Sequence, residues 1–106
     1  MSYRIVYKSL AQIEVGEAYA WYADPKIKRG DSFLAELERT DNFLAINPYL
    51  YPCVEHEIRR TSLHGFPYSL FFVIDDSAVS VLSCFHQHRK PMTREELLGG
   101  KVPSKS

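Results

Sequence analysis

The segment Tyr68–Ile74 constrains the fold more than any other part of the chain, because it is strongly apolar and aromatic and carries no charged residue. A short run of this kind, with β-branched and aromatic side chains, is typical of a β-strand that is buried on both faces. The polar triplet Asp75-Asp76-Ser77 follows and predicts a hairpin turn, and Val79–His86 predicts the partner strand. The second half of the chain is therefore expected to form an antiparallel sheet.

Upstream of this sheet, the apolar residues recur with the period of a helix. One helical stripe is formed by Ala11, Val15, Ala18 and Tyr22. Trp21 widens this stripe and is expected to pack with it, and Ser9 is the candidate N-cap. The helix is expected to end at Asp24-Pro25, because the residue before a proline avoids the α region.

A second helix is predicted after the turn and N-cap signal Gly30-Asp31-Ser32. Phe33, Leu37 and Leu44 share one face of it, and Asn47-Pro48 stops it. Because the link between the two helices is short, they are expected to form an αα-hairpin.

Two further strands complete the predicted element order. Tyr3–Tyr7 is aromatic and β-branched, and Val54–Leu63 is a more polar candidate strand. The fold class is therefore α+β: an N-terminal strand, an αα-hairpin and a three-stranded antiparallel meander (β-α-α-β-β-β), with the helices packed on one face of the sheet. At 106 residues the chain is expected to be a single domain, 1–106, with a core of about 3–91, and the polar tail 92–106 is expected to contain one helical turn at Thr93–Leu98.

The charge balance is neutral, with 13 basic and 13 acidic residues. Any basic surface must therefore be local, since proteins that bind nucleic acid through phosphate contacts usually carry net positive charge. Cys53 and Cys84 form no C-x-x-C pair and are expected to be reduced thiols. No apolar run approaches the roughly 20 residues of a membrane span, and no signal peptide is apparent, so the expected location is cytoplasmic.

The candidate functional residues are histidines and arginines of the second half. His86 is expected to share a strand face with Leu82 and Cys84, since side chains two apart point the same way. Folded as a meander, the basic groups could converge on one patch that binds a target or a phosphate. Its members are Arg59, Arg60, His64, His88, Arg89 and Lys90, together with His86.

Such a patch suits RNA cleavage through the 2′-OH without a metal or other cofactor. His86 would act as acid or base, because the pKa of histidine lies near the working pH. Arg60 and Arg89 would bind the phosphate bidentately.

Simpler structural roles compete with these assignments. His86 could merely satisfy hydrogen bonds at a strand end, and Arg59 and Arg60 could be charges that protect a strand edge. His86-Gln87-His88 could be half of a zinc site, but no further ligands appear at a recognisable spacing. Tyr68 is better explained as core, and Cys84 is not expected to be a nucleophile.

Several of these segments together resemble the RelE/ParE toxin superfamily. The resemblance spans about residues 3–91 and rests on the order and spacing of short motifs. They are the helix pattern Ala11…Ala18…Trp21-Tyr22, the stretch Gly30…Phe33…Leu37…Leu44…Asn47-Pro48, Arg60 with Leu63, Phe66-Pro67-Tyr68 before the apolar strand, and His86-x-x-Arg89-x-Pro91 at the end.

The resemblance implies the toxin component of a type II toxin–antitoxin module, which inhibits growth and is neutralised by a cognate antitoxin encoded beside it. ParE-like members inhibit DNA gyrase, whereas RelE-like members cleave mRNA on the ribosome. Arg60, His86 and Arg89 match the family's motif positions best. The neutral charge favours the ParE-like interpretation and the histidines favour the nuclease, and of the two the ParE-like interpretation is narrowly preferred. An inactive, toxin-like binding module is a third hypothesis, and a homodimer is conceivable without antitoxin.

Overall fold

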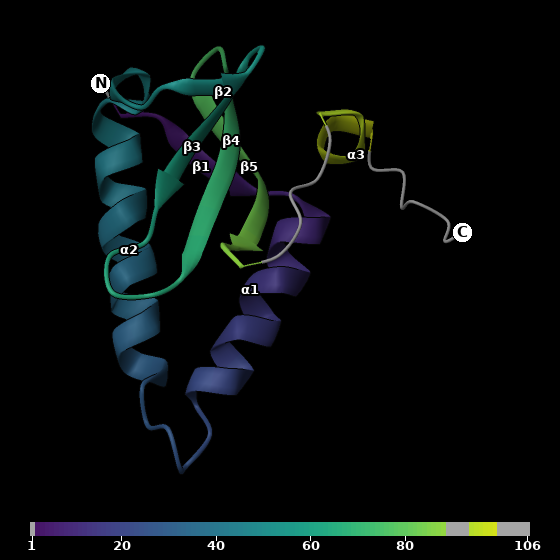
Figure 1. The fold of residues 1–106 in the computed structure, drawn as a ribbon. Coiled ribbons are helices and arrows are strands. Elements are labelled where there is room, and N and C mark those ends of the chain that lie inside the picture. The colour runs from purple at the N-terminus through teal and green to yellow at the C-terminus, as the bar shows by residue number, and fades with distance from the viewer. Residues whose placement is uncertain (1, 89–93, 100–106) are drawn as a thin grey trace.

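The computed structural model describes residues 2–88 and 94–99 (Figure 1). An N-terminal strand leads into two long helices, and a short 3₁₀ turn then precedes four consecutive strands. The elements are β1 (Arg4–Tyr7), α1 (Ser9–Tyr22), α2 (Gly30–Ile46), η1 (Pro48–Leu50), β2 (Cys53–Glu55), β3 (Ile58–Ser62), β4 (Tyr68–Asp75), β5 (Ala78–His86) and α3 (Arg94–Gly99). The predicted α+β class and the placement of a helical pair before the antiparallel strands are both confirmed.

The five strands form one sheet in the order β1-β5-β4-β3-β2. β2 to β5 pair antiparallel in sequence order, whereas β1 pairs parallel to β5. The parallel pair is possible because the connection between β1 and β5 is long: it contains the helical hairpin and the strands β2 to β4, and it brings the chain back to the end of the sheet where β1 begins. β5 is consequently a central strand between β1 and β4.

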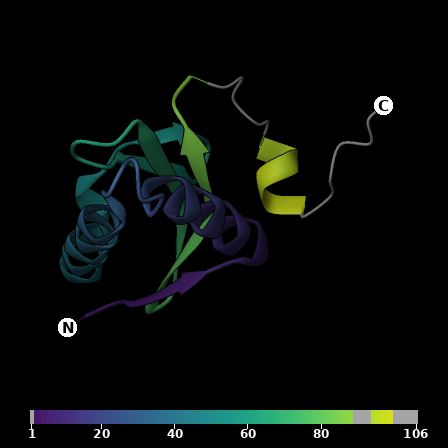
Figure 2. The ribbon, with the colours of Figure 1, turned by 90° about the horizontal axis from the view of Figure 1, so that it is seen from below.

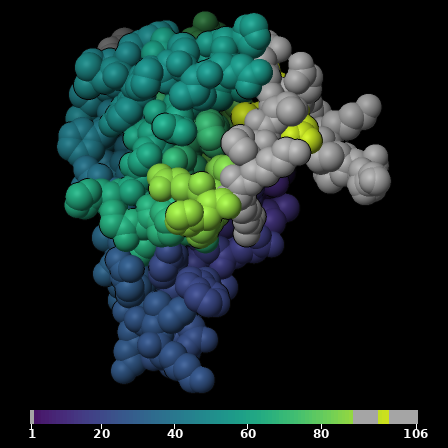
Figure 3. All heavy atoms as spheres, viewed as in Figure 1, coloured from purple at the N-terminus to yellow at the C-terminus, as the bar shows by residue number. Residues whose placement is uncertain are grey.

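The two long helices cover one face of the sheet, which we call the helix face. Figure 1 shows them joined by a tight loop at their far end, and Figure 3 shows this end projecting beyond the body of the molecule. The main core fills the space between the helices and the sheet. Its fully buried members include Ala11, Phe33, Leu44, Leu70, Phe72, Val79 and Val81. Burial of these side chains supplies most of the stabilisation, at about 1.5–3 kcal/mol for each large one.

The opposite face of the sheet, which we call the outer face, carries a smaller cluster. Ile58 and Leu82 are buried there with Leu97 of α3, and Phe71 and Val73 pack around them. Figure 2 shows α3 beside β5 and away from α2. The apolar run of β4 is therefore covered on both faces, as its sequence predicts.

A register shift between Phe71 and Phe72 leaves an extra residue in β5, because Phe71 pairs with Ser83 while Phe72 pairs with Val81. The bulge places Leu82 in the outer cluster, whereas Cys84 joins the main core. The predicted common face of Leu82, Cys84 and His86 is therefore wrong for Leu82. An extra residue shifts the alternation of side chains beyond it, and the local sequence carries no sign of this.

Three further details differ from the sequence predictions. The segment 54–63 divides into β2 and β3 around a turn in which His56 has a φ of 51°, so a fourth antiparallel strand extends the meander. Neither predicted side-chain cap forms: the N-cap residues are Lys8 and Arg29, without a side-chain cap hydrogen bond. Trp21 is 65% exposed rather than packed, whereas its neighbour Tyr22 is buried.

Candidate functional site

A pocket of about 370 Å³ opens between the second half of α1 and the ends of β4 and β5. We call it the α1 pocket. Its helical lining consists of Glu14, Glu17, Ala18, Trp21 and Tyr22, and its sheet lining of Tyr68, Cys84 and His86. Because His86 is the histidine that the sequence singles out, this pocket is the candidate functional site.

Glu14 is held in the wall of the pocket by the edge of β5. β1 pairs with β5 only as far as Val81, so the edge of β5 beyond that point lacks a strand neighbour on this side. The Glu14 Oε1 atom accepts hydrogen bonds from the Ser83 hydroxyl at 2.7 Å and from the Cys84 N–H at 2.8 Å. The carboxylate thereby replaces the missing strand partner for the bulged segment, which fixes its position.

His86 ends β5 directly opposite Tyr68 on β4. The two rings meet edge to face, with centroids 5.0 Å apart. The His88 N–H donates to His86 Nδ1 at 3.1 Å, and the two imidazole rings lie 5.2 Å apart. Because Nδ1 accepts this hydrogen bond, a neutral His86 ring carries its proton on Nε2. The predicted proximity of His86 and His88 is thus present in the structure.

Arg60 lies elsewhere. It pairs with Phe71 and shares the outer face with Ile58, two residues before it on β3, whereas His86 pairs with Tyr68 on the helix face. Directly paired residues share a face, so the sheet separates the Arg60 side chain from His86. Arg89 and Lys90 lie outside the described residues. The structure therefore brings His86 and His88 together and does not bring Arg60 to them.

Arg59 and His64 have structural contacts. Arg59 Nη1 donates to the carbonyls of Tyr49 and Tyr51, and its guanidinium lies 5.0 Å from the Tyr49 ring centroid, so it anchors the η1 segment. The His64 backbone N–H donates to Glu36 Oε2 at 2.6 Å, which ties the β3–β4 loop to α2, while the residue itself is exposed.

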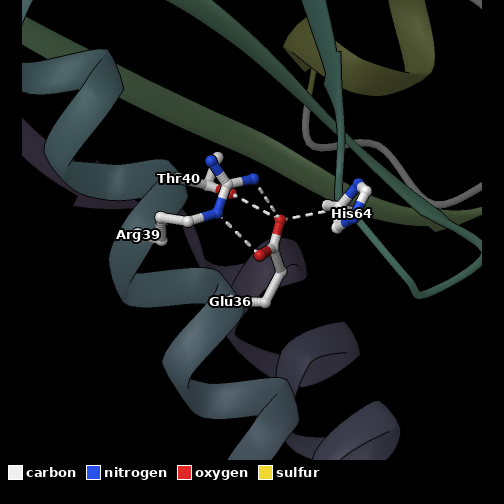
Figure 4. A network of polar contacts seen from close by, with 4 residues as sticks. All are labelled: Glu36, Arg39, Thr40 and His64. Carbon is white, nitrogen blue, oxygen red and sulfur yellow. Dashed lines mark hydrogen bonds and ion pairs between the residues drawn. The ribbon is translucent and has the colours of Figure 1, made fainter.

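The carboxylate of Glu36 is the centre of a polar network on α2 (Figure 4). It accepts two hydrogen bonds from Arg39, at 2.8 and 2.7 Å, and one from the Thr40 hydroxyl at 3.4 Å, besides that from His64. The Arg39 guanidinium, aided by His64, lowers the pKa of Glu36 against the opposing effect of burial. This network holds the loop that precedes β4 and Tyr68.

Arg29 is a basic residue near the site that the sequence patterns did not single out. Its guanidinium lies 4.3 Å from the Phe66 ring centroid and 5.7 Å from that of Tyr22, and it donates to the Gly65 carbonyl at 3.2 Å. Gly65 has a φ of 85°, which suits glycine, and this turn brings its carbonyl to Arg29. In the sequence, the one sign of this role was that Arg29 stands directly before Gly30.

The electrostatics of the pocket do not favour a thiol nucleophile. Burial, followed by the nearby Glu14 carboxylate, raises the pKa of Cys84 to about 12. The reactive species is the thiolate, so Cys84 is unreactive at neutral pH. Cys84 and His86 share the pocket lining, but the thiol serves as a small apolar core group.

Among residues 2–88 and 94–99, no three His, Cys, Asp or Glu side chains are grouped closely enough to hold a metal ion. None of the helices within these residues is long and apolar enough to cross a membrane. The described lining of the pocket offers one imidazole, two phenols and two carboxylates, and the His88 imidazole lies beside that of His86. These are groups that can move protons.

Comparison with known proteins gives a likeness of structure and none of sequence. No family model matches the chain, and no curated protein matches it. The fold, however, is similar to that of a chain in a solved toxin–antitoxin structure. That structure is described as "Chromosomal ParDE TA system from P. aeruginosa". Its chain superimposes with a TM-score of 0.67, over 80% of this chain and 96% of that chain, at 12% identity. At that identity the likeness shows a shared fold.

Proposed function

We propose that this chain is the toxin component of a toxin–antitoxin module and that it acts by binding a protein target, with DNA gyrase preferred. The shared fold with a chain of a ParDE toxin–antitoxin system supports the first part. The resemblance of the sequence motifs to RelE/ParE toxins points to the same class.

The residues around His86 are the observation that favours binding of a protein target over RNA cleavage. A metal-free ribonuclease needs a cation where the negative charge develops on the phosphate. Among the described residues that line the α1 pocket, none is an arginine or lysine, and two are glutamates. Arg60 lies across the sheet from His86. The two glutamates in the described lining and the position of Arg60 on the other face of the sheet support a toxin without a nuclease centre.

A test of this function begins with induced expression in growing cells, followed by separate measurement of DNA and protein synthesis. We expect growth arrest in which DNA synthesis falls first. Purified gyrase should then lose supercoiling activity when the protein is added in stoichiometric amounts. Full supercoiling activity at a large excess of the protein would refute gyrase as the target. Normal growth on expression would leave the inactive binding module as the better explanation.

RNA cleavage is the second candidate function, and the His86–His88 pair beside Tyr68 is the observation that favours it. Loss of an acid or base group lowers a rate by about 10²–10⁴-fold. The variant His86→Ala is therefore the deciding test. Unchanged growth arrest and no mRNA cleavage by either protein support target binding, whereas mRNA cleavage that His86→Ala abolishes supports the nuclease.

An antitoxin is the proposed cognate partner, and exposed apolar side chains offer it a surface. Ile46, Tyr49 and Leu50, at the end of α2 and in η1, are 69%, 58% and 75% exposed. Clustered apolar exposure of this kind is typical of protein-binding surfaces. The product of an adjacent gene should co-purify with the chain, and Leu50→Asp should weaken that complex. Size-exclusion chromatography without the antitoxin would detect the proposed homodimer.

A further inference from the structure

The imidazoles of His86 and His88 form a pair at the surface of the molecule. Their ring centroids lie 5.2 Å apart, and the two ring planes are inclined by 48°. His88 is exposed, and His86 is partly buried at the end of β5. Figure 3 shows this end of β5, in light green, on the surface. The pair is therefore accessible to an ion and to another protein molecule.

The separation of the two rings is that of a metal chelate. In a tetrahedral zinc site the Zn–N bonds are about 2.0–2.1 Å long, and two imidazoles that point at the ion then have centroids roughly 5 Å apart. His86 and His88 stand at this separation. Small rotations of the two side chains therefore suffice to aim both rings at one ion.

The ring nitrogens of the pair can serve as ligands. Within residues 2–88 and 94–99, these nitrogens take part in one hydrogen bond, from the His88 N–H to His86 Nδ1. Binding of an ion at His86 Nε2 moves the proton of the neutral ring to Nδ1 and costs this exposed hydrogen bond, which water replaces. Imidazole nitrogen suits Zn²⁺, Cu²⁺ and Ni²⁺.

The described part of the chain supplies half of a coordination sphere. A closed zinc site has four ligands, and within residues 2–88 and 94–99 no third His, Cys, Asp or Glu side chain is placed to join the pair. A symmetric dimer presents the same surface patch twice. A two-fold axis through the ion therefore brings a second pair of imidazoles to it, and four nitrogen ligands complete a tetrahedron.

We infer that His86 and His88 bind a divalent transition-metal ion of the Zn²⁺ class and that a second copy of the chain completes the site. The ion links the two chains through four imidazoles. Binding of the ion does not depend on the proposed toxin function, and it gives the proposed homodimer a defined point of contact.

Zinc titration of the purified, untagged full chain tests this site. Light scattering should show that the molecular mass doubles as zinc chloride is added and that the change saturates at one ion for two chains. Excess chelator should restore the monomer. Co²⁺ in place of zinc should give the visible absorption of a tetrahedral centre. Mg²⁺ should have neither effect, because it prefers oxygen ligands in octahedral geometry.

His88→Gln is the test variant, since it removes one imidazole and keeps the backbone N–H of residue 88. It should abolish the doubling and weaken zinc binding by more than about tenfold, because even the partners of metal ligands contribute about 10–100-fold to affinity. His56→Asn is the matched control. His56 is an exposed histidine in the β2–β3 turn, and its φ of 51° is one that asparagine tolerates.

The control should bind zinc like the original chain, and circular dichroism without zinc should show that both variants are folded. Mass doubling that His88→Gln abolishes and His56→Asn retains would support the site. No zinc-dependent doubling, uptake of one zinc ion by each monomer, or equal zinc binding by His88→Gln and the original chain would each overturn it.

Discussion

The Glu36 network yields the sharpest prediction about stability. The Glu36 side chain is 9% exposed, and its carboxylate accepts hydrogen bonds from three residues, Arg39, Thr40 and His64. Replacement by leucine keeps the volume of the side chain but removes every acceptor. The Thr40 hydroxyl is buried and the His64 N–H is partly buried, so both lose a partner that water only partly replaces.

The magnitude follows from these contacts. A buried donor that loses its acceptor costs about 1–3 kcal/mol. The Arg39 side chain is half exposed, so water replaces its lost ion pair at a cost of about 0–1 kcal/mol. We therefore expect Glu36→Leu to lower the free energy of unfolding by about 2–4 kcal/mol. This is a large share of the roughly 5–15 kcal/mol that stabilises a domain of this size.

Urea denaturation followed by circular dichroism measures this change. With a slope of about 2 kcal/mol per molar urea, the midpoint should fall by about 1–2 M. Arg39→Gln is the matched control, since it removes the exposed member of the network, and it should cost no more than about 1 kcal/mol. A Glu36→Leu midpoint within experimental error of the original protein would refute the reasoning, because it would mean that the orphaned donors find other partners.

The pH dependence of Glu36 provides an independent check. The Arg39 hydrogen bonds lower the pKa of Glu36 in the folded state, from an ordinary value of 4.5. A group with a lowered folded pKa stabilises the protein above its unfolded pKa and loses that contribution as the pH falls through the folded value. The stability difference between the original protein and the isosteric Glu36→Gln variant should therefore be largest near pH 7 and shrink below pH 4.5. A difference that grows on acidification would contradict this sign.

Three other predictions concern single residues. A thiol reagent at neutral pH should modify one cysteine per native chain, the exposed Cys53. It should modify Cys84 only after denaturation, because that thiol is buried and its pKa is raised to about 12. Rapid labelling of both cysteines in the native chain would contradict the burial of Cys84. Leu70→Ala should cost about 2–5 kcal/mol in urea unfolding because Leu70 is fully buried, whereas Leu50→Ala should stay within about 0.5 kcal/mol because Leu50 is 75% exposed. Arg59→Ala should destabilise by about 1–2 kcal/mol through loss of its carbonyl contacts to η1, and a change smaller than 0.5 kcal/mol, roughly the effect of a neutral surface substitution, would show that the anchor is dispensable.

The fold could be predicted from the sequence because its elements carry strong and separate periodicities. Ala11, Ala18 and Tyr22 are all buried as the helical stripe requires, and the apolar run of β4 is covered on both faces. The two predicted helix caps were wrong because capping depends on the conformation of a single residue. The packing of Trp21 was predicted wrongly because a helical stripe has no sharp border, and the stripe alone does not show which residue at its edge is covered.

The candidate site was less predictable because it depends on which face each side chain occupies. Arg59 and Arg60 are adjacent, so one points toward the helix face and the other toward the outer face. If the predicted alternation along the strand is wrong by one residue, the two arginines are assigned to the wrong faces. The bulge in β5 changes the phase again between Leu82 and Cys84. A cluster of basic residues in the sequence is therefore a poor guide to a cluster in space when the residues lie on strands.

Glu14 shows why the character of the pocket could not be read from the second half of the chain alone. It lies 69 residues before Ser83 and 70 before Cys84, and no local pattern links them. The link arises because β1 ends before β5 does, which leaves β5 backbone that a side chain from α1 must satisfy. The length of β1 thus explains why a carboxylate from α1, and not a further strand residue, lies beside this part of β5.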